Sequence, residues 1–581
     1  TELFKRFSAI SEEEIELCNN LLWNRGEDPV AAFADFYRDK TVTKTDKSTL
    51  PLMERLPQYI LEGSKDGLRE DLDEAMQSMK PLEIINGPLM AGMDIVGKLF
   101  NENKLIVAEV LQSAEAMKAA VAHLEQFMEK NDTQTKAKIL LATVKGDVHD
   151  IGKNLVDIIL SNNGYDVINL GIKITSDQIL AAVKEHGPDM IGLSGLLVKS
   201  AQQMIITADD LAKSGIDLPI LVGGAALTRN FVNRKIAAAY EGTVVYAKDA
   251  MDGLSIANKI IQPESFEQLK ASIASEIAEL SDLNEAKKEE RKEVLTRSSK
   301  LSFVDNIPEP SDYQKHVIKN TPLDLIWKFI NPIMLYGRHL GLNGKLAKFI
   351  GEGNFKELKN MDGGQKAIEL YEEVEKVKKL YRDTHFSAGA VYQFFKANGE
   401  GNTVKIFKNN TDESSSHEIT FPRQNKEDGL CLSDYLNREK ASDNICFFSV
   451  TFGNGIRELA EKLKNEGNYL HSHIVAALAL ESAEAYAEYL HQKIRALWGF
   501  EDSIDMTMMD RFRANYRGKR YSFGYPACPS LEDQSVLFDL LNPTPDIGVE
   551  LTEGFMMDPE ASVSAIVFHH PEATYYSVGG V

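Results

Sequence analysis

Cysteine is scarce in this chain of 581 residues, and the four cysteines lie far apart, with no CxxC pair among them. This usage is typical of a reducing compartment, and it argues against a zinc site or a disulfide framework. The chain also lacks uninterrupted apolar runs of membrane-spanning length and an N-terminal signal-peptide pattern. We therefore expect a cytoplasmic protein with no membrane partner. The cysteines are Cys18, Cys431, Cys446 and Cys528.

Basic residues are in deficit, since 65 Lys and Arg face 87 Asp and Glu, which gives a formal net charge of −22. A nucleic-acid-binding protein would need a basic face, so no nucleic-acid partner is expected. The hydrophobic fraction of 43% is ordinary for a globular protein. The length predicts about three or four domains. Because the first residue is Thr1 and not Met, we expect a fragment of a longer protein.

Residues 1–130 are predicted to form a helical bundle. Apolar residues recur every three or four positions in three segments, which are 72–79, 88–100 and 107–128. Amphipathic helices of this kind bury their apolar faces against one another. In the first segment, one helical face carries Leu72, Ala75, Met76 and Met79.

Residues 131–262 alternate short apolar strands with helices. This pattern predicts a doubly wound, five-stranded parallel sheet of the flavodoxin-like (Rossmann-like) type, in which ligands bind at the carboxyl ends of the strands. The expected strands are 138–144, 166–170, 190–193, 220–222 and 244–246. The expected helices are 152–162, 176–186, 201–214, 228–240 and 250–260.

The loop after the first expected strand carries a candidate metal-binding motif. Asp147, His149 and Gly152 form an Asp-x-His-x-x-Gly pattern directly after the apolar run 139–144. The histidine can present one ring nitrogen to a metal while Asp147 accepts a hydrogen bond from the other and fixes the tautomer. Gly152 leaves space for a bulky group close to the backbone. A pattern of this kind also occurs by chance, with the histidine in a structural role.

Two further loops at the same sheet edge favour a binding site. Ser194-Gly195 follows the third expected strand, and Gly223-Gly224 follows the fourth. Together with these loops, the run from Lys145 to Asn154 resembles the cobalamin-binding signature of B12-dependent methyltransferases and mutases. The small residues would line a channel for the long nucleotide tail of a corrinoid. Ser200 could close a relay through Asp147 to His149.

The rest of the chain is predicted to be a charged linker over residues 263–310 and a mixed α and β domain over 311–581. The run from Arg520 to Pro529, RYSFGYPACP, joins an arginine that can face a carboxylate to an irregular loop. On physical grounds alone this is a weak small-molecule site. The longest expected helices are 365–381, 456–465 and 469–497, and the expected strands include 403–407, 445–450 and 565–568.

Over essentially its whole length the chain resembles the C-terminal half of cobalamin-dependent methionine synthases. The resemblance rests on the DVHDIGKN run and, with more specificity, on the GYPACP run. It implies a helical cap domain, a cobalamin-binding α/β domain and a mixed α+β activation domain that binds S-adenosylmethionine. The cofactor is cobalamin, as methylcobalamin, with His149 as the lower axial ligand of cobalt and Asp147 and Ser200 as its relay.

The same resemblance assigns residues to both ligands. Phe100 and Val107 would shield the methyl group, although an ordinary core position is the alternative for Val107. Cobalamin-binding positions are Asn86, Phe100, Val107, Gly146, Asp147, Val148, His149, Asp150, Gly152, Ser194, Gly195, Val198, Gly223, Gly224 and Ala250. S-adenosylmethionine-binding positions are Asn331, Glu484, Arg520, Tyr525, Tyr575 and Tyr576. Departures from the family pattern are Asn86 for Glu, Val198 for Thr and Asn331 for Asp.

The implied activity is methyl transfer from methyltetrahydrofolate to homocysteine by way of methylcobalamin. It includes reductive reactivation of cob(II)alamin with S-adenosylmethionine and an electron from flavodoxin or a flavodoxin-like reductase. The homocysteine and folate modules would lie N-terminal to this chain. The runner-up hypothesis is a non-enzymatic corrinoid carrier for separate methyltransferases. Such carriers resemble residues 1–262 only, and neither a DNA-binding module nor a mutase barrel is evident.

Overall fold

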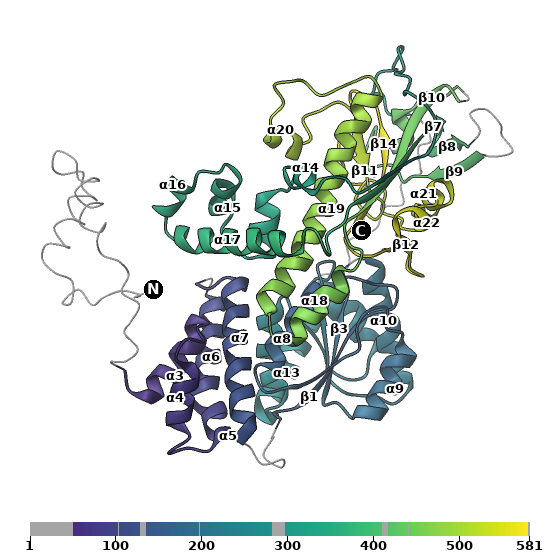
Figure 1. Cartoon of the computed structure of the whole chain (residues 1–581). Helices are drawn as coiled ribbons and strands as arrows, with labels where there is room; N and C mark the ends of the chain where they lie inside the picture. The colour runs from purple at the N-terminus through teal and green to yellow at the C-terminus, as the bar shows by residue number, and fades with distance from the viewer. Residues whose placement is uncertain are drawn as a thin grey trace, which may run out of the picture.

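The computed structural model describes residues 50–102, 104–127, 135–196, 198–281, 297–408, 416–439 and 441–578. Figure 1 shows a helical bundle beside an α/β domain, with a mixed domain of strands and helices above both. The expected multidomain class, a bundle, a parallel sheet and a mixed α+β region, is therefore confirmed.

The helical bundle is built from four main helices whose apolar faces meet. One of its predicted helices is misplaced, because the helix expected over 72–79 begins at Leu68 and ends at Ala75. Leu68, Leu72 and Ala75 supply its buried face, and the chain then turns toward the next helix, which starts at Pro81. The main helices are α3 (Leu52–Glu62), α4 (Leu68–Ala75), α6 (Met90–Asn101) and α7 (Val107–Leu124). Shorter turns are α5 (Pro81–Ile84), η3 (Ile85–Leu89) and η4 (Glu125–Phe127).

The α/β domain has the predicted five-stranded parallel sheet, in the order β2-β1-β3-β4-β5. Its strands are β1 (Lys138–Thr143), β2 (Asp166–Asn169), β3 (Met190–Ser194), β4 (Ile220–Gly223) and β5 (Val244–Tyr246). The helices are α8 (Ile151–Ser161), α9 (Ser176–His186), α10 (Val198–Lys213), α12 (Ala250–Ile260) and α13 (Pro263–Ser281). The single helix expected over 228–240 is instead a series of short turns, α11 (Arg229–Phe231), η5 (Val232–Ile236) and η6 (Ala237–Ala239).

The predicted charged linker begins as an ordered helix. Phe266, Leu269 and Ile273 of α13 pack against the core shared by the bundle and the α/β domain. Residues 282–296 lie outside the described residues. The chain resumes at Arg297, which donates to the carbonyl oxygens of Asp434, Leu301 and Ser302.

The mixed domain is centred on an antiparallel sheet in the order β11-β14-β10-β7-β8-β9, with β6 also paired to β7. Its strands are β6 (His316–Lys319), β7 (Gly389–Glu400), β8 (Thr403–Phe407), β9 (Ser416–Thr420), β10 (Asp443–Thr451), β11 (Lys519–Tyr521) and β14 (Ser562–Phe568). A separate hairpin pairs β12 (Glu550–Leu551) with β13 (Met557–Asp558). The helices and turns are α14 (Leu323–Trp327), η7 (Ile333–His339), α15 (Gly344–Gly351), α16 (Phe355–Lys359), α17 (Gly364–Tyr381), η9 (Leu432–Tyr435), α18 (Ile456–Asn465), α19 (Tyr469–Leu497), α20 (Met508–Phe512), α21 (Gln534–Leu541) and α22 (Thr544–Ile547).

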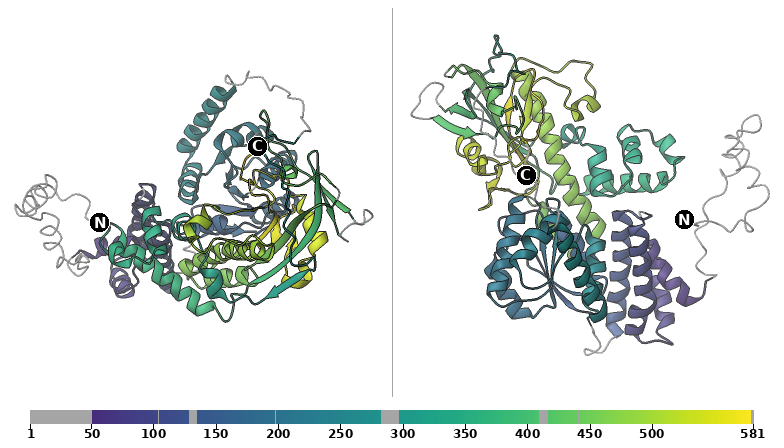
Figure 2. Two further views of the ribbon diagram at one scale, coloured as in Figure 1. Left: turned by 90° about the horizontal axis from the view of Figure 1, so that it is seen from above. Right: turned by 180° about the vertical axis from the view of Figure 1, so that it is seen from behind.

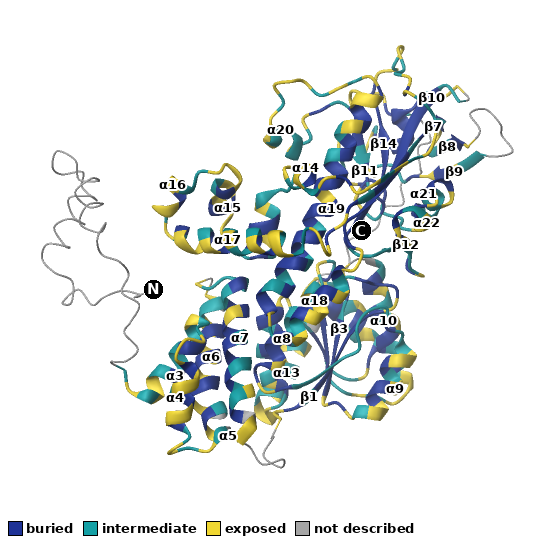
Figure 3. Ribbon diagram, in the orientation of Figure 1, coloured by how far each residue is buried: buried dark blue, intermediate teal, exposed yellow. Residues whose placement is uncertain are grey.

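Helix α19 connects the three parts of the molecule. It has 29 residues, packs on β10 and β14 of the mixed domain, and reaches α7 and α8 below (Figure 2). Most of its length is buried, as Figure 3 shows. Within the described residues, neither α19 nor any other helix combines the length and apolarity that crossing a membrane requires. Helix α19 thus packs against all three parts of the molecule and forms part of the boundary between them.

The hairpin formed by β12 and β13 lies on the loop between β1 and α8. Thr552 donates a hydrogen bond of 2.8 Å from its hydroxyl to the carbonyl oxygen of Gly146. A Cβ at Gly146, where φ is 77°, would lie 3.0 Å from Cα of Gly554, so the two backbones are in contact. The mixed domain thus rests directly on the loop that carries His149.

A second contact between these domains is ionic. Lys464 of α18 lies 3.2 Å from Asp157 of α8, and both side chains are largely buried. Burial opposes the charge on Lys464, but Asp157 and Glu461 outweigh it and raise the pKa of this lysine. We expect Lys464→Met to remove the cationic partner of Asp157, which keeps its hydrogen bonds from Asn169 and Ser161, and to loosen the docking of the mixed domain.

The measurement for Lys464→Met is amide hydrogen exchange at the facing ends of α8 and α18. We expect exchange about tenfold faster than in the unaltered chain, the usual size for loss of one partly buried ion pair. The matched control is Lys462→Met, because Lys462 is exposed and its ion pair is with Glu466 of its own domain, at 4.0 Å. Equal exchange in the two variants would show that the ion pair does not hold the domains together.

Candidate functional site

Two predicted residues of the loop after β1 form one hydrogen-bonded group with a third from α10. The Asp147 side chain is fully buried, and its carboxylate accepts from the backbone N–H and the ring Nδ1 of His149, at 2.9 and 2.6 Å. It also accepts from the Ser200 hydroxyl and, at 2.8 Å, from the backbone N–H of Leu196. The structure therefore brings His149, Asp147 and Ser200 together in the order that the sequence suggested.

Burial, hydrogen bonds and nearby charges shift the pKa values of Asp147 and His149. Burial raises the pKa of Asp147, but the hydrogen bonds from His149 and Ser200 outweigh it, and the net shift is downward. Burial opposes protonation of His149, whereas Asp147 and the carboxylate of Glu560 raise its pKa above the ordinary value. Because Nδ1 is held by Asp147, the other nitrogen, Nε2, is the one left for a metal.

The loops after β3 and β4 approach each other through glycine backbone. A Cβ at Gly224, where φ is 149°, would lie 1.7 Å from the carbonyl oxygen of Gly195. A Cβ at Gly195 would lie 2.5 Å from Cβ of Ser200. Gly152, at the start of α8, has open space where a Cβ would be. These positions give the sheet edge a wall made of backbone, with room for a large ligand.

A cavity of about 940 Å³ lies between this edge and the mixed domain. Leu141, Leu160 and Leu221 also line it, so it continues into the interior of the α/β domain. None of its lining residues comes from the described part of the helical bundle. The predicted site residues that line it are His149, Gly152, Ser194, Gly195, Gly223, Gly224, Ala250, Asn331, Glu484, Arg520, Tyr525 and Tyr575.

The two predicted cap residues lie elsewhere in this arrangement. Phe100 packs, half-buried, against the core of the bundle, and Val107 packs against the core of the mixed domain. A Cβ at Gly341 would lie 2.9 Å from the backbone nitrogen of Val107. Elements of the mixed domain therefore occupy the place above the sheet edge. The side chains of Asn86 and Val198 lie outside the described part of the structure.

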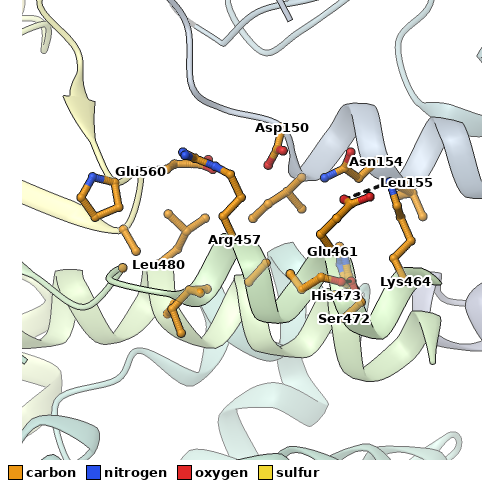
Figure 4. A pocket seen from close by; sticks show the side chains of 18 of the residues that line it. Asp150, Asn154, Leu155, Arg457, Glu461, Lys464, Ser472, His473, Leu480 and Glu560 are labelled. Atoms are coloured by element: carbon orange, nitrogen blue, oxygen red, sulfur yellow. Dashed lines mark hydrogen bonds and ion pairs between the residues drawn. The ribbon is translucent and has the colours of Figure 1, made fainter. Parts of the chain in front are cut away.

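Four other predicted positions do not line the large cavity. Asp147 and Val148 are buried within the loop, and Gly146 is covered by the hairpin. Asp150 instead lines a smaller cavity of about 70 Å³ between α8, α18 and α19. Figure 4 shows Arg457 and Lys464 of α18 in this smaller cavity, close to residues of α8.

At the far end of the large cavity, an arginine lies between two glutamates of α19. Arg520 contacts Glu488 at 2.6 Å and Glu484 at 3.6 Å. Burial opposes its charge, but Glu488 outweighs it and raises the pKa of Arg520. Desolvation raises the pKa of Glu484, and Arg520 lowers it in part. This end of the cavity presents both a positive and a negative group to a ligand.

The remaining predicted residues differ in position. Tyr525 and Tyr575 are exposed toward the cavity, by 59% and 51% respectively. Asn331 also lines the cavity, but its side-chain oxygen accepts from the backbone N–H of Ile333 at 3.0 Å. Tyr576 does not line the cavity and packs against the core on the other side of the sheet. The structure thus brings five of the six positions to one cavity.

Sequence reasoning missed two ionisable residues near His149. Lys153 is 4% exposed, donates to Asn154 and Asn169 at 2.7 and 2.8 Å, and has its pKa lowered by burial to about 8. Glu560 lines both cavities, and burial raises its pKa to about 7. Lys153 could have been noticed as part of the DVHDIGKN run. Glu560 carries no local signal, because only the fold brings it to His149.

Comparison with known proteins finds family matches in three parts of the chain. Residues 339–581 match the family model described as vitamin B12 dependent methionine synthase, activation domain. Residues 52–125 and 137–254 each match a B12 binding domain model. A solved structure of the MetH reactivation domain bound to AdoHcy is 27% identical, covering 48% of this chain and 87% of that chain, with a TM-score of 0.44.

Two curated relatives match almost the whole chain. Methionine synthase of Mycobacterium leprae (strain TN) is 36% identical over 621 residues, covering 98% of this chain and 50% of the relative. Methionine synthase of Mycobacterium tuberculosis (strain ATCC 25618 / H37Rv) is 36% identical over 606 residues, with the same coverage. The chain spans about half the length of these relatives. It belongs to the vitamin B12-dependent methionine synthase family, and carries that family's B12-binding and activation domains.

Proposed function

We propose that this chain binds cobalamin at the carboxyl edge of the parallel sheet and reactivates it with a methyl group from S-adenosylmethionine. One observation carries the proposal. A single cavity is lined by both His149 and Arg520, so a cofactor held by the first and a methyl donor held by the second would share one space. A shared site of this kind holds two reactants in place.

The residues at the sheet edge fit a corrinoid. His149 lines the cavity, and Nε2, the ring nitrogen that Asp147 does not hold, would bind cobalt while Asp147 fixes the ring. The glycine backbone of Gly195 and Gly224 and the apolar extension past Leu160 and Leu221 suit a large ring with a long tail. Cobalamin would supply the cobalt atom that accepts and gives the methyl group. The protein's part is to hold His149, shape the cavity and exclude water.

The opposite end of the cavity suits S-adenosylmethionine. The guanidinium of Arg520 would face the carboxylate of the ligand, and Glu484 would face its ammonium group. Tyr525 and Tyr575 offer exposed rings that can stack on the adenine. We also propose that the domain limits are 1–130, 131–262 and 311–581, with 263–310 between.

The activity of the whole protein is part of the proposal. Relatives about twice as long are named methionine synthase, which supports methyl transfer from methyltetrahydrofolate to homocysteine through modules outside this chain. A flavodoxin or flavodoxin-like reductase in the cytoplasm would supply the electron. The carrier hypothesis is not better supported, because the cavity is built by the mixed domain as much as by the α/β domain.

The direct test follows a labelled methyl group. The cobalamin-loaded chain is reduced chemically and given S-adenosylmethionine labelled in its methyl group, and label on protein-bound cobalamin is measured. We expect about one label per chain. Arg520→Lys should lower the rate at limiting S-adenosylmethionine by at least about thirtyfold, because lysine lacks the planar fork that grips a carboxylate.

The matched control is Arg517→Lys, three positions away. Arg517 donates to the carbonyl oxygen of His569 and stacks on Phe500, outside the large cavity. This variant should label as fast as the unaltered chain. Cobalamin that is bound but never labelled would favour the carrier hypothesis, and equal rates in the two arginine variants would remove Arg520 from the donor site.

A second prediction concerns His149 alone. We expect His149→Ala to keep binding cobalamin, because the cavity walls are unchanged, while the absorption spectrum loses the signature of a lower nitrogen ligand. Binding of S-adenosylmethionine, measured by calorimetry, should be unaltered because Arg520 and Glu484 belong to the mixed domain and pair with each other, not with His149. His186→Ala, at the exposed end of α9, is the control. A spectrum identical to that of the control would exclude His149 as the cobalt ligand.

A further inference from the structure

Helix α19 presents three carboxylates to the large cavity. Glu481, Glu484 and Glu488 are spaced by three and four residues, so they lie on one helical face, and all three line the cavity. Only Glu484 was expected at the site from the sequence. Glu481 and Glu488 were not expected, and they differ in how far their negative charges are paired with cationic side chains.

Glu488 and Glu484 both have cationic partners. Glu488 accepts from Arg520 at 2.6 Å and from the hydroxyl of Tyr516 at 3.1 Å, and its other oxygen lies 3.8 Å from Arg495. Glu484 shares Arg520, at 3.6 Å. Their negative charges are therefore largely balanced within the protein.

Glu481 is different because no Lys or Arg among the described residues forms an ion pair with it. Its side chain is 6% exposed, and Oε1 is held by Nε2 of His339 at 2.9 Å. Oε2 makes no hydrogen bond with any described residue, although the residue lines the cavity. A buried carboxylate with one oxygen fixed and the other free toward a cavity is a site for a cationic ligand group.

The opposite wall carries the cation Arg338, which lines the cavity next to His339 and lowers the pKa of Tyr525. His339 ends the turn η7, which also brings Met334 to the cavity, and Asn331 lies just before this turn. The Asn331 oxygen is already used by the backbone N–H of Ile333. The electrostatic influence of Glu481 extends to Tyr525, because Glu484 and, to a smaller degree, Glu481 raise the pKa of that tyrosine. Glu481 therefore acts on the same space as the expected donor site.

We infer that Glu481 is a specificity-determining residue that selects S-adenosylmethionine through the positive charge on its sulfur. The inference rests on the proposed function, in which the methyl donor binds in this cavity. S-adenosylmethionine carries a sulfonium, whereas the demethylated product, S-adenosylhomocysteine, is neutral at sulfur and otherwise alike. A fixed carboxylate beside the sulfur attracts the first and not the second. The same difference favours release of the spent donor.

The two ligands provide the test, because both keep the amino and carboxylate groups. Calorimetry on the cobalamin-loaded chain gives the Kd of each ligand in the unaltered protein and in Glu481→Gln. The amide keeps the size of the side chain and can still accept from His339. We expect the affinity for S-adenosylmethionine to fall about tenfold, the usual size for one lost charged contact, and that for S-adenosylhomocysteine to stay within about twofold.

The matched control is Glu373→Gln. Glu373 forms a pair of the same kind, 2.8 Å from Nε2 of His471, outside the large cavity. It should change neither affinity, and thermal unfolding of both variants checks that the fold is kept. Equal weakening of both ligands by Glu481→Gln would place Glu481 at the amino group and overturn the inference, as would no change in either. Failure of both ligands to bind the unaltered chain would instead refute the proposed function.

Discussion

The geometry of the site depends on the buried carboxylate of Asp147. It accepts hydrogen bonds from His149, Leu196 and Ser200, and so ties the loop after β1 to the loop after β3. Each donor would be left without a partner if the carboxylate were lost, at about 1–3 kcal/mol per buried group. The packing leaves no room for a side chain at Gly195, whose Cβ would lie 2.5 Å from Cβ of Ser200 and 3.1 Å from Oδ2 of Asp147. One interaction therefore sets the tautomer of His149, the loop spacing and the need for glycine.

The docking of the mixed domain extends this constraint across the interface. Its hairpin touches the backbone of Gly146, one residue before Asp147, and Glu560 follows the hairpin to a place near His149. Any shift of the loop after β1 would therefore disturb its contact with the hairpin. The ion pair between Lys464 and Asp157 lies on the other side of α8 and limits rotation of the domains about the hairpin contact.

Much of this could be predicted from the sequence, because the signals are local. The strands of the parallel sheet are short apolar runs, and α9, α12, α18 and α19 have the expected bounds, since each has a clear apolar period or a capping residue. The single helix predicted over 228–240 was wrong, because the apolar residues there are spaced as in a helix while the backbone forms π and 3-10 turns. Local periodicity does not encode that difference.

The residues of the site also divide into those with a local sequence signal and those without one. The loop residues from Gly146 to Gly152 are neighbours in sequence, so their shared role could be predicted. Glu560 and His339 could not be, because neither belongs to a motif and each reaches the cavity only through the packing of a separate element. Glu481 and Glu488 are intermediate, since their spacing from Glu484 on a predicted helix already put them on its face. The position of Val107 required knowledge of which domain lies above the sheet edge.

The position of Val107 bears on which domain can cover the sheet edge. The wall facing His149 is made by α19 and η7, and Gly341 of the mixed domain touches the backbone of Val107. The bundle and the mixed domain therefore cannot both cover the sheet edge at once. For the bundle to reach it, the pairs of Lys145 with Glu553 and of Lys464 with Asp157 would have to separate. The first pair is exposed, weak and screened by salt, whereas Lys464 and Asp157 are largely buried. Apolar residues such as Leu111 and Ile158 also pack into the core of the mixed domain, so separation has to break apolar packing as well.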